Sequence, residues 1–342
     1  MRFLKIFIFI LAIFIAGNNV MAKEILTKKE QNIVLISSYT ASGDLENLEQ
    51  ATKKGLEDGL TVNEVKEVMV QLYAYCGFPK SINAIATLMK VSKDGKYKQG
   101  KEGTPLRKDA DKNAIGEKTQ TKLCGSPVKG ELFEFAPALD DYLKEHLFGD
   151  IFARGVLTDK EREIATISAL VTIGNVQPQL NAHIQIAKNT GVTQEQADEI
   201  IDIVKNAQYK PTFGLGEKND AYAKYFIGQS YLNPLSKEQV PLFNVTFEPR
   251  CRNNWHIHHA GKDGKGGQIL IVTDGRGYYQ EWGKPARELH KGDVVNIPAG
   301  VKHWHGAAKD SWFSHIAVEV PSEGSKNEWL EPVSDEEYNK LK

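Results

Sequence analysis

The sequence predicts an α+β multidomain protein in which a helical region is followed by a single β-barrel. Between residues 31 and 230, apolar residues recur at helical spacing and follow helix-capping signatures. From residue 241 onward, short apolar runs are separated by glycine and proline at close intervals, which is typical of the strands of a barrel or sandwich. A length of 342 residues suits two or three domains at about 150 residues each.

The N-terminal segment has the features of a secretory signal peptide over residues 1–22. Basic residues precede an unbroken apolar run over 7–16, and Val20 and Ala22 fit the small-residue positions of a cleavage site. An uncleaved membrane anchor is the alternative, but a bilayer span needs about 20 apolar residues. The sequence therefore predicts an exported protein, periplasmic or secreted, with no stable membrane span after cleavage.

Two helical units are predicted, at 23–90 and 131–230, separated by a connector at 91–130. In the first unit, Thr61 and Glu64 form a capping box at a helix start. The connector mixes lysine, glycine and aspartate with few apolar residues, so it is expected to be a loop with a solvated basic surface.

The second unit repeats the pattern of the first. Thr158 and Glu161 form another capping box, and Thr193 caps a later helix. The segment 59–69, with Gly-Leu-Thr before its apolar positions, matches 191–201, with Gly-Val-Thr. The match indicates a duplicated all-α domain, with chance similarity of two amphipathic helices as the alternative.

The β region is predicted to form a barrel at 240–322, followed by a C-terminal tail at 323–342. Its expected strands are 242–247, 268–273, 277–282, 293–297 and 315–320.

The formal net charge of −1 gives no electrostatic reason to expect a nucleic-acid partner. Cys76, Cys124 and Cys251 have no zinc-site spacing, and an odd number leaves at least one unpaired within the chain. They are expected to be isolated thiols.

The helical part resembles the carboxymuconolactone decarboxylase family over about 30–90 and 130–205. The resemblance is carried by segments 75–79, 148–152, 157–163 and 183–193. It implies a duplicated helical domain, a homo-oligomer, and either lactone-acid decarboxylation or thiol peroxidase activity. The peroxidase branch uses a Cys-x-x-Cys pair, and the equivalent positions here are Val176 and Gln179. Without those thiols, peroxide reduction is not expected.

His183 and Glu163 are the candidate catalytic residues of the helical part, because a histidine beside a carboxylate can be tuned for proton transfer. His183 is the best candidate to protonate carbon after a decarboxylation. The alternatives are a core or interface histidine and, for Glu163, a solvated helix face. Glu161 is sufficiently explained by its capping role.

The β part carries four potential metal ligands. His256 and His258 lie two apart on a predicted strand and so point to the same face. Gln268 and His303 come from later strands. Together with Gly292, Pro298 and Gly300, these residues resemble the two motifs of the cupin family over about 240–320.

The resemblance implies a divalent metal (Zn, Mn, Fe or Ni) held by His256, His258, Gln268 and His303. Most cupins have glutamate where this chain has Gln268, after an inserted turn at 261–265. Three imidazoles and an amide leave the metal its full +2 charge, so it should be a strong Lewis acid and favour anionic ligands. The alternative is a barrel that binds no metal.

His305 lies two residues beyond His303 and should share its face. It is a candidate general base, a substitute ligand, or a hydrogen-bonded barrel histidine. His259 should face away, and His290 and His315 are interpreted as structural.

Taken together, these features predict an exported metal-dependent enzyme for a small carboxylated or oxygenated molecule, with decarboxylation or lyase chemistry leading. A cupin dioxygenase or isomerase with a helical oligomerisation scaffold is the second hypothesis. A periplasmic ligand-binding module without catalysis is the third.

Overall fold

The computed structural model describes residues 25–341, and the predicted signal peptide lies outside them. The chain divides into two compact units, each described by itself. Of the described residues, the first unit contains 25–167 and 178–200, and the second contains 168–177 and 201–341. No helix in the described part of the chain has both the length and the apolar character needed to cross a bilayer.

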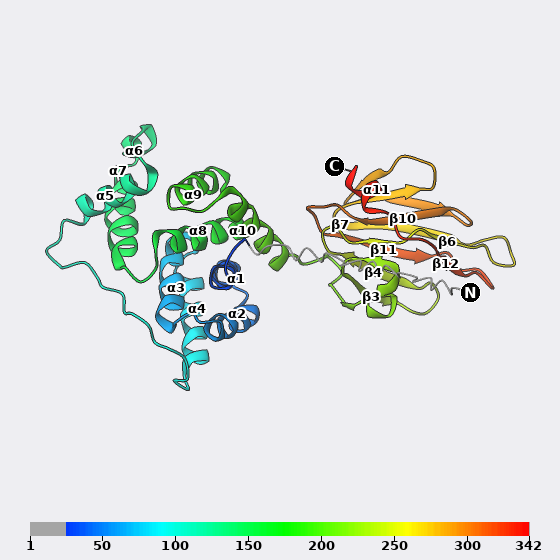
Figure 1. The fold of residues 1–342 in the computed structure, drawn as a ribbon, viewed down its shortest axis with the longest axis horizontal. Helices are drawn as coiled ribbons and strands as arrows, with labels where there is room; N and C mark the ends of the chain where they lie inside the picture. Colours follow the sequence, from blue (N-terminus) through cyan, green and yellow to red (C-terminus); the bar gives the residue numbers. More distant parts are fainter. Residues whose placement is uncertain (1–24, 342) are drawn as a thin grey trace, which may run out of the picture. The chain divides into compact units, whose positions relative to one another are not determined.

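The first unit is built from helices, as predicted (Figure 1). Its helices, some of which continue into the second unit, are α1 (Lys28–Ser42), α2 (Leu45–Glu57), α3 (Val62–Cys76), α4 (Phe78–Ser92), α5 (Lys112–Cys124), α6 (Glu131–Phe135), α7 (Pro137–Asp141), α8 (Asp159–Ile173), α9 (Gln177–Asn189) and α10 (Gln194–Ala207). A π-helical segment, η1 (Tyr142–Ile151), precedes α8.

Both predicted capping boxes are present. Thr61 and Glu64 satisfy each other's backbone N–H groups at the start of α3. Thr158 and Glu161 do the same at the start of α8. Thr193 accepts a hydrogen bond from the Gln196 backbone N–H at the start of α10. These caps satisfy donors that the first helical turn leaves free, which fixes where each helix begins.

A second pair of matching helices strengthens the case for duplication. Residues 26–43 and 157–174 both begin Leu-Thr-x-Lys-Glu and both end in glycine. Their first turns exchange ion pairs: Lys29 Nζ lies 2.6 Å from Glu161, and Lys160 Nζ lies 2.7 Å from Glu30. Such reciprocity is what two equivalent helices related by a local pseudo-twofold axis produce.

The connector is only partly the loop that the sequence predicts, because α5 lies within it. Asp111 caps this helix. A Cβ added at Gly116 would meet the Lys144 carbonyl oxygen, so the glycine lets α5 approach η1 closely. The helix packs through a small residue and has few large apolar positions, which explains why the apolar pattern did not reveal it.

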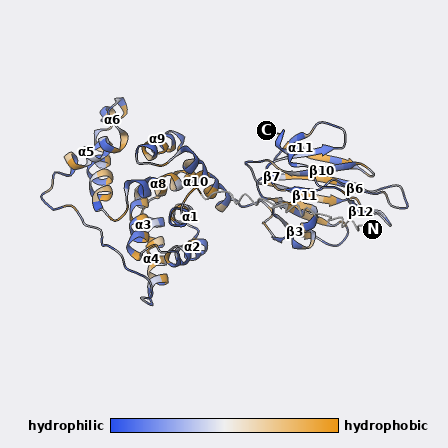
Figure 2. Cartoon of the chain, in the orientation of Figure 1, coloured by the Kyte–Doolittle hydropathy of each residue, from blue (hydrophilic) through white to orange (hydrophobic). Residues whose placement is uncertain are grey.

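The second unit contains the β-barrel. Its strands are β1 (Glu217–Lys218), β2 (Phe226–Ile227), β3 (Ser230–Ser236), β4 (Leu242–Phe247), β5 (Arg252–Asn253), β6 (His256–His258), β7 (Gly267–Glu281), β8 (Arg287–His290), β9 (Val294–Pro298), β10 (Lys302–Ala307), β11 (Phe313–Glu319) and β12 (Asn327–Trp329). All their pairings are antiparallel, and Figure 2 shows apolar residues along these strands. Side chains such as Phe247, Val272 and Phe313 form the barrel core.

Strand β7 joins the two halves of the sheet. Its first half pairs with β9 and β11, and its second half pairs with β8 and β10. The sequence predicts two strands here, at 268–273 and 277–282, whereas the structure has one continuous strand. Gly275 lies at the change of partners with a φ of +74°, where a Cβ would collide with the Trp312 carbonyl oxygen.

The barrel unit extends beyond the predicted 240–322 at both ends. Strands β1 to β3 precede it, and β12 and helix α11 (Asp335–Asn339) follow it. Arg252 holds the tail by donating to the Val333 carbonyl at 3.0 Å and to Asp335 at 2.6 Å. Tyr338 donates to the Ala307 carbonyl at 2.8 Å. The described part of the predicted tail, 323–341, is therefore an integral part of the barrel.

The three cysteines, Cys76, Cys124 and Cys251, are free thiols, as expected. Burial raises the pKa of all three.

Candidate metal centre

The predicted ligands come from three neighbouring strands. His256 and His258 lie on β6, Gln268 lies on β7, and His303 lies on β10. Strands β6 and β10 pair with His303 directly opposite His256, so these side chains share a face. The ring centroids of His256 and His303 are 4.1 Å apart, and those of His258 and His303 are 5.6 Å apart.

Three of the four predicted ligands, His256, His258 and Gln268, line a cavity of about 180 Å³ in the barrel unit, and His303 is not among its lining residues. Apolar side chains cover part of its wall and polar ones the rest. The lining residues are Asn219, Tyr222, Phe226, Leu232, Phe243, Val245, Asn253, His256, His258, Gln268, His305, His315, Ala317, Glu319, Asn327 and Trp329. A cavity of this size suits a small molecule with an apolar part and a few oxygen atoms.

Backbone carbonyls orient two of the imidazoles. His256 Nδ1 lies 3.0 Å from the Asn254 carbonyl, and His303 Nδ1 lies 2.9 Å from the Val301 carbonyl. Each bond places the proton on Nδ1 and leaves Nε2 with a free lone pair. This arrangement is typical of metal-binding histidines.

Buried polar atoms without a hydrogen-bond partner gather here among the described residues. His315 Nδ1 is one, and three belong to predicted ligands: His258 Nε2, His303 Nε2 and Gln268 Oε1. Leaving such atoms unpaired costs roughly 1–3 kcal/mol each, so buried orphans call for a water or an ion. All three can donate a lone pair to a metal. The residues therefore fit a divalent cation by their chemistry and by their unmet bonding capacity.

The electrostatics are also suited to a cation. Burial lowers the pKa of His256 far below its usual range, lowers that of His258, and lowers that of His303 to about 4. The imidazoles are thus neutral at neutral pH, which is the state that a metal requires.

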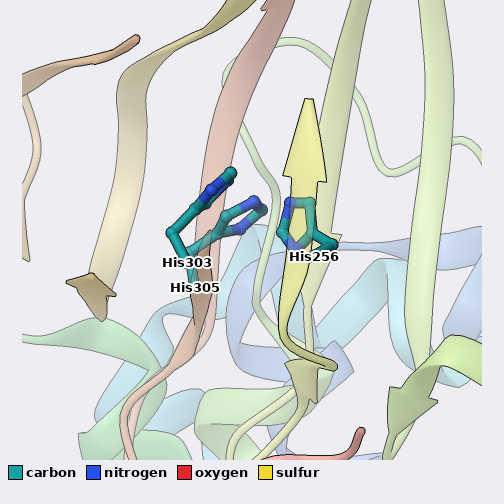
Figure 3. A group of neighbouring side chains, drawn as sticks. All are labelled: His256, His303 and His305. Atoms are coloured by element: carbon teal, nitrogen blue, oxygen red, sulfur yellow. The ribbon is translucent and has the colours of Figure 1, made fainter. Parts of the chain in front are cut away.

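A second donor set shares two of these histidines. Ring nitrogens of His256, His303 and His305 all lie within 4.8 Å of one another, and the three rings converge in Figure 3. However, His305 is already engaged: its Nδ1 lies 3.2 Å from His315 Nε2, and its Nε2 lies 3.0 Å from Asn253 Nδ2. The free lone pairs of His258 and Gln268 therefore favour the predicted set, with His305 beside it.

His315 has a different place from the one predicted. The sequence interpretation treated it as structural, but it is fully buried, lines the cavity and contacts His305. Asn253 also holds His305, since its Oδ1 accepts the His305 backbone N–H at 2.9 Å. His259 and His290 lie outside the lining and pair with Glu328 and Glu288, respectively.

Sequence reasoning missed Glu319 and Trp329 as cavity residues. Glu319 had a usable signal, because His315, Ala317 and Glu319 alternate along β11 and must share one face. No sequence signal marked Trp329 as a cavity residue, because the tail was interpreted as lying outside the barrel. It stacks on His256 with ring centroids 4.7 Å apart.

The candidate residues of the helical unit also meet. His183 Nδ1 lies 2.8 Å from Glu163 Oε2, and the Tyr75 ring packs edge-on against His183. Glu163 is fully buried, so its interpretation as part of a solvated helix face is wrong. Its second oxygen has no hydrogen-bond partner among the described residues. Val176 and Gln179, where the family resemblance places the thiols of the peroxidase branch, carry none.

The buried histidines predict how the metal-free barrel responds to acid. Burial lowers the pKa of His303 and of His315 to about 4, against about 6.5 in an unfolded chain. Between these values the unfolded state binds more protons, so the free energy of unfolding should fall as pH drops from 6.5 to 4. Above pH 6.5 this stability is fully present. The loss should reach at most about 3 kcal/mol per histidine.

Urea unfolding of the chelator-treated protein across this pH range tests the expectation. His315→Gln should flatten the pH dependence, and His290→Gln, at an exposed histidine, should not. An unchanged slope in His315→Gln would show that its burial does not set the acid sensitivity.

A family of known proteins matches most of the helical part of the chain. Residues 11–89 and 137–213 match the carboxymuconolactone decarboxylase family. The chain is 39% identical over 122 residues to the (R)-mandelonitrile lyase of Granulicella tundricola, covering 34% of this chain and 88% of that protein. An uncharacterised protein of Methanocaldococcus jannaschii is 33% identical over 69 residues, covering 20% of this chain and 64% of that protein. A solved cupin-like protein of Thermotoga maritima is 42% identical, covering 38% of this chain and 95% of that one, with a TM-score of 0.33.

Proposed function

The chain belongs to the family of the Granulicella (R)-mandelonitrile lyase, fused to carboxymuconolactone decarboxylase-family helices, and from this premise we propose that its cupin barrel is a metal-dependent lyase. The proposed substrate is a small hydroxylated molecule of the cyanohydrin type. The observation that carries the proposal is the group of unpartnered donor atoms of His258, Gln268 and His303. His258 and Gln268 line the cavity, and His303 lies opposite the cavity residue His256 on the paired strand.

His256, His258, Gln268 and His303 would hold the metal, which we expect to be Zn, Mn, Fe or Ni. When bound there, it would act as a Lewis acid toward a hydroxyl or carbonyl oxygen. The neutral donor set would leave it its full charge.

His305 is the proposed proton acceptor. It lines the cavity beside the donor set, and Asn253 and His315 fix its ring. In the cleavage of a cyanohydrin, the substrate hydroxyl takes the place of the Asn253 amide at His305 Nε2, and this nitrogen accepts the hydroxyl proton as the carbonyl forms. The bond to the nitrile carbon breaks and its electron pair leaves with cyanide. Transfer of the proton from His305 to cyanide then yields hydrogen cyanide and restores the neutral imidazole.

The helical unit is proposed to be a scaffold for this reaction and for a homo-oligomer. It keeps the buried Glu163–His183 pair but lacks the thiols of the peroxidase branch. We also propose that the protein is exported, because residues 1–22 have the sequence features of a secretory signal peptide.

The test is release of benzaldehyde from mandelonitrile by the metal-loaded protein, measured against the spontaneous reaction at mildly acidic pH. We expect enantioselective release of benzaldehyde. His303→Ala should abolish it, and His183→Ala should keep its rate within about twofold of the wild-type rate. Loss of activity in His183→Ala would assign catalysis to the helical unit. If a metal-loaded protein releases no benzaldehyde above background, the lyase proposal fails. Metal-dependent oxygen uptake would then favour the dioxygenase alternative.

A further inference from the structure

The side chain of Glu319 places one carboxylate among the residues that line the cavity. Glu319 ends β11, and its partner across the β7–β11 ladder is Gln268, so both side chains lie on the cavity face. Its Oε1 accepts a hydrogen bond from Asn327 at 2.5 Å and lies 3.8 Å from His258 Nδ1. The carboxylate is therefore positioned beside the donor set and within reach of any ligand bound there.

The charge of Glu319 is not cancelled by a cation. Among the described residues that line the cavity there is no lysine or arginine, and Glu319 is the one acidic side chain. Its only ion-pair geometry among the described residues is the long contact with His258. The Asn327 amide supplies a dipole but no net charge. Because 47% of the Glu319 side chain is exposed, water weakens its field without removing it.

The remaining wall offers neutral contacts. Asn219, Asn253 and Asn327 provide amides, while Tyr222, Phe226 and Trp329 provide aromatic surface. An uncharged ligand can use all of these groups. A carboxylate ligand would instead bring a second negative charge close to Glu319, and like charges in a partly desolvated site repel.

We propose that Glu319 is a specificity-determining residue that makes this cavity select neutral ligands over carboxylated ones. The full positive charge of a metal on neutral donors favours anions, and Glu319 opposes that preference. The inference rests on the proposed function for the use of this cavity as the substrate site. It adds a reason why this site takes uncharged hydroxyl or carbonyl compounds, such as a cyanohydrin, and excludes the carboxylated molecules that the sequence alone left open.

Benzamide and benzoate test the proposal, because they have nearly the same shape and differ by one charge. Calorimetric titration of the metal-loaded protein gives the ratio of their dissociation constants. Glu319→Gln keeps the side-chain shape and removes the charge. It should strengthen benzoate binding by roughly three- to tenfold and leave benzamide nearly unchanged. Glu319→Lys should shift the ratio further toward benzoate.

The matched control is Glu323→Gln, which changes the net charge equally at an exposed residue that pairs with Lys262 outside the cavity. It should leave the ratio unchanged. An equal shift in the control, or no shift in either Glu319 variant, would overturn the proposal. So would failure of the wild-type protein to bind benzamide.

Metal content separates this inference from the proposed function. Glu319→Gln should keep its metal, and loss of the metal would make Glu319 a ligand instead of a charge filter. If Glu319→Gln shifts the binding ratio but the wild-type protein does not cleave mandelonitrile, the selectivity role of Glu319 stands and the lyase proposal fails. If the wild-type protein cleaves mandelonitrile but Glu319→Gln leaves the ratio unshifted, the lyase proposal stands and the selectivity role of Glu319 fails.

Discussion

Replacing His303 by alanine should lower the affinity of the barrel for a divalent metal by more than about 100-fold. Loss of an outer-shell partner of a metal ligand already costs about 10–100-fold, and a direct ligand should cost more. His303 is fully buried, its Nδ1 is bonded to a backbone carbonyl, and its Nε2 is free.

Competition with a chromophoric chelator measures this affinity. The control is His259→Ala, because His259 is next to a predicted ligand but pairs with Glu328 at 2.6 Å outside the cavity. It should bind metal as the wild-type protein does. Equal affinities for the two variants would show that His303 is not a ligand.

Replacing Arg154 by methionine should destabilise the helical unit by about 3 kcal/mol. Glu67 on α3 is only 1% exposed, and Arg154 donates to its two oxygens over 2.8–3.0 Å. Arg162, which lies 3.8 Å from Glu67, is too distant to replace these hydrogen bonds. The substitution keeps most of the apolar volume of Arg154 and leaves a buried carboxylate without its principal partner.

Urea unfolding followed by circular dichroism measures the loss in the helical signal. The double variant Glu67→Gln with Arg154→Met should recover most of the stability, because it removes the unpaired charge. Lys122→Met breaks an exposed pair with Asp159 and should cost less than about 1 kcal/mol. If Arg154→Met is no more harmful than Lys122→Met, the buried pair does not stabilise this unit.

Local signals in the sequence predicted much of the fold. Thr61 and Thr158 mark helix starts because capping needs only residues three positions apart. Strand 242–247 was predicted with the bounds that the structure has. Helix α5 was missed because it packs through Gly116 and not through a stripe of large apolar residues.

The site was predictable where ligands share a strand. His256 and His258 are two apart, and the alternation that places them together also places His315, Ala317 and Glu319 on one face. The contribution of Trp329 could not be predicted, because it depends on the tail pairing with β6 through residues distant in the sequence. Likewise, the bonds of His305 to Asn253 and His315 arise only when three strands meet.

The most direct test of a metal centre built from His256, His258, Gln268 and His303 is the metal content of protein purified without added metal. We expect a stoichiometric divalent metal in the wild-type protein and in His305→Ala, and little in His258→Ala. Wild-type protein without metal would contradict the account. Metal retained in His258→Ala but lost in His305→Ala would contradict it too, because the ion would then belong to the set of His256, His303 and His305.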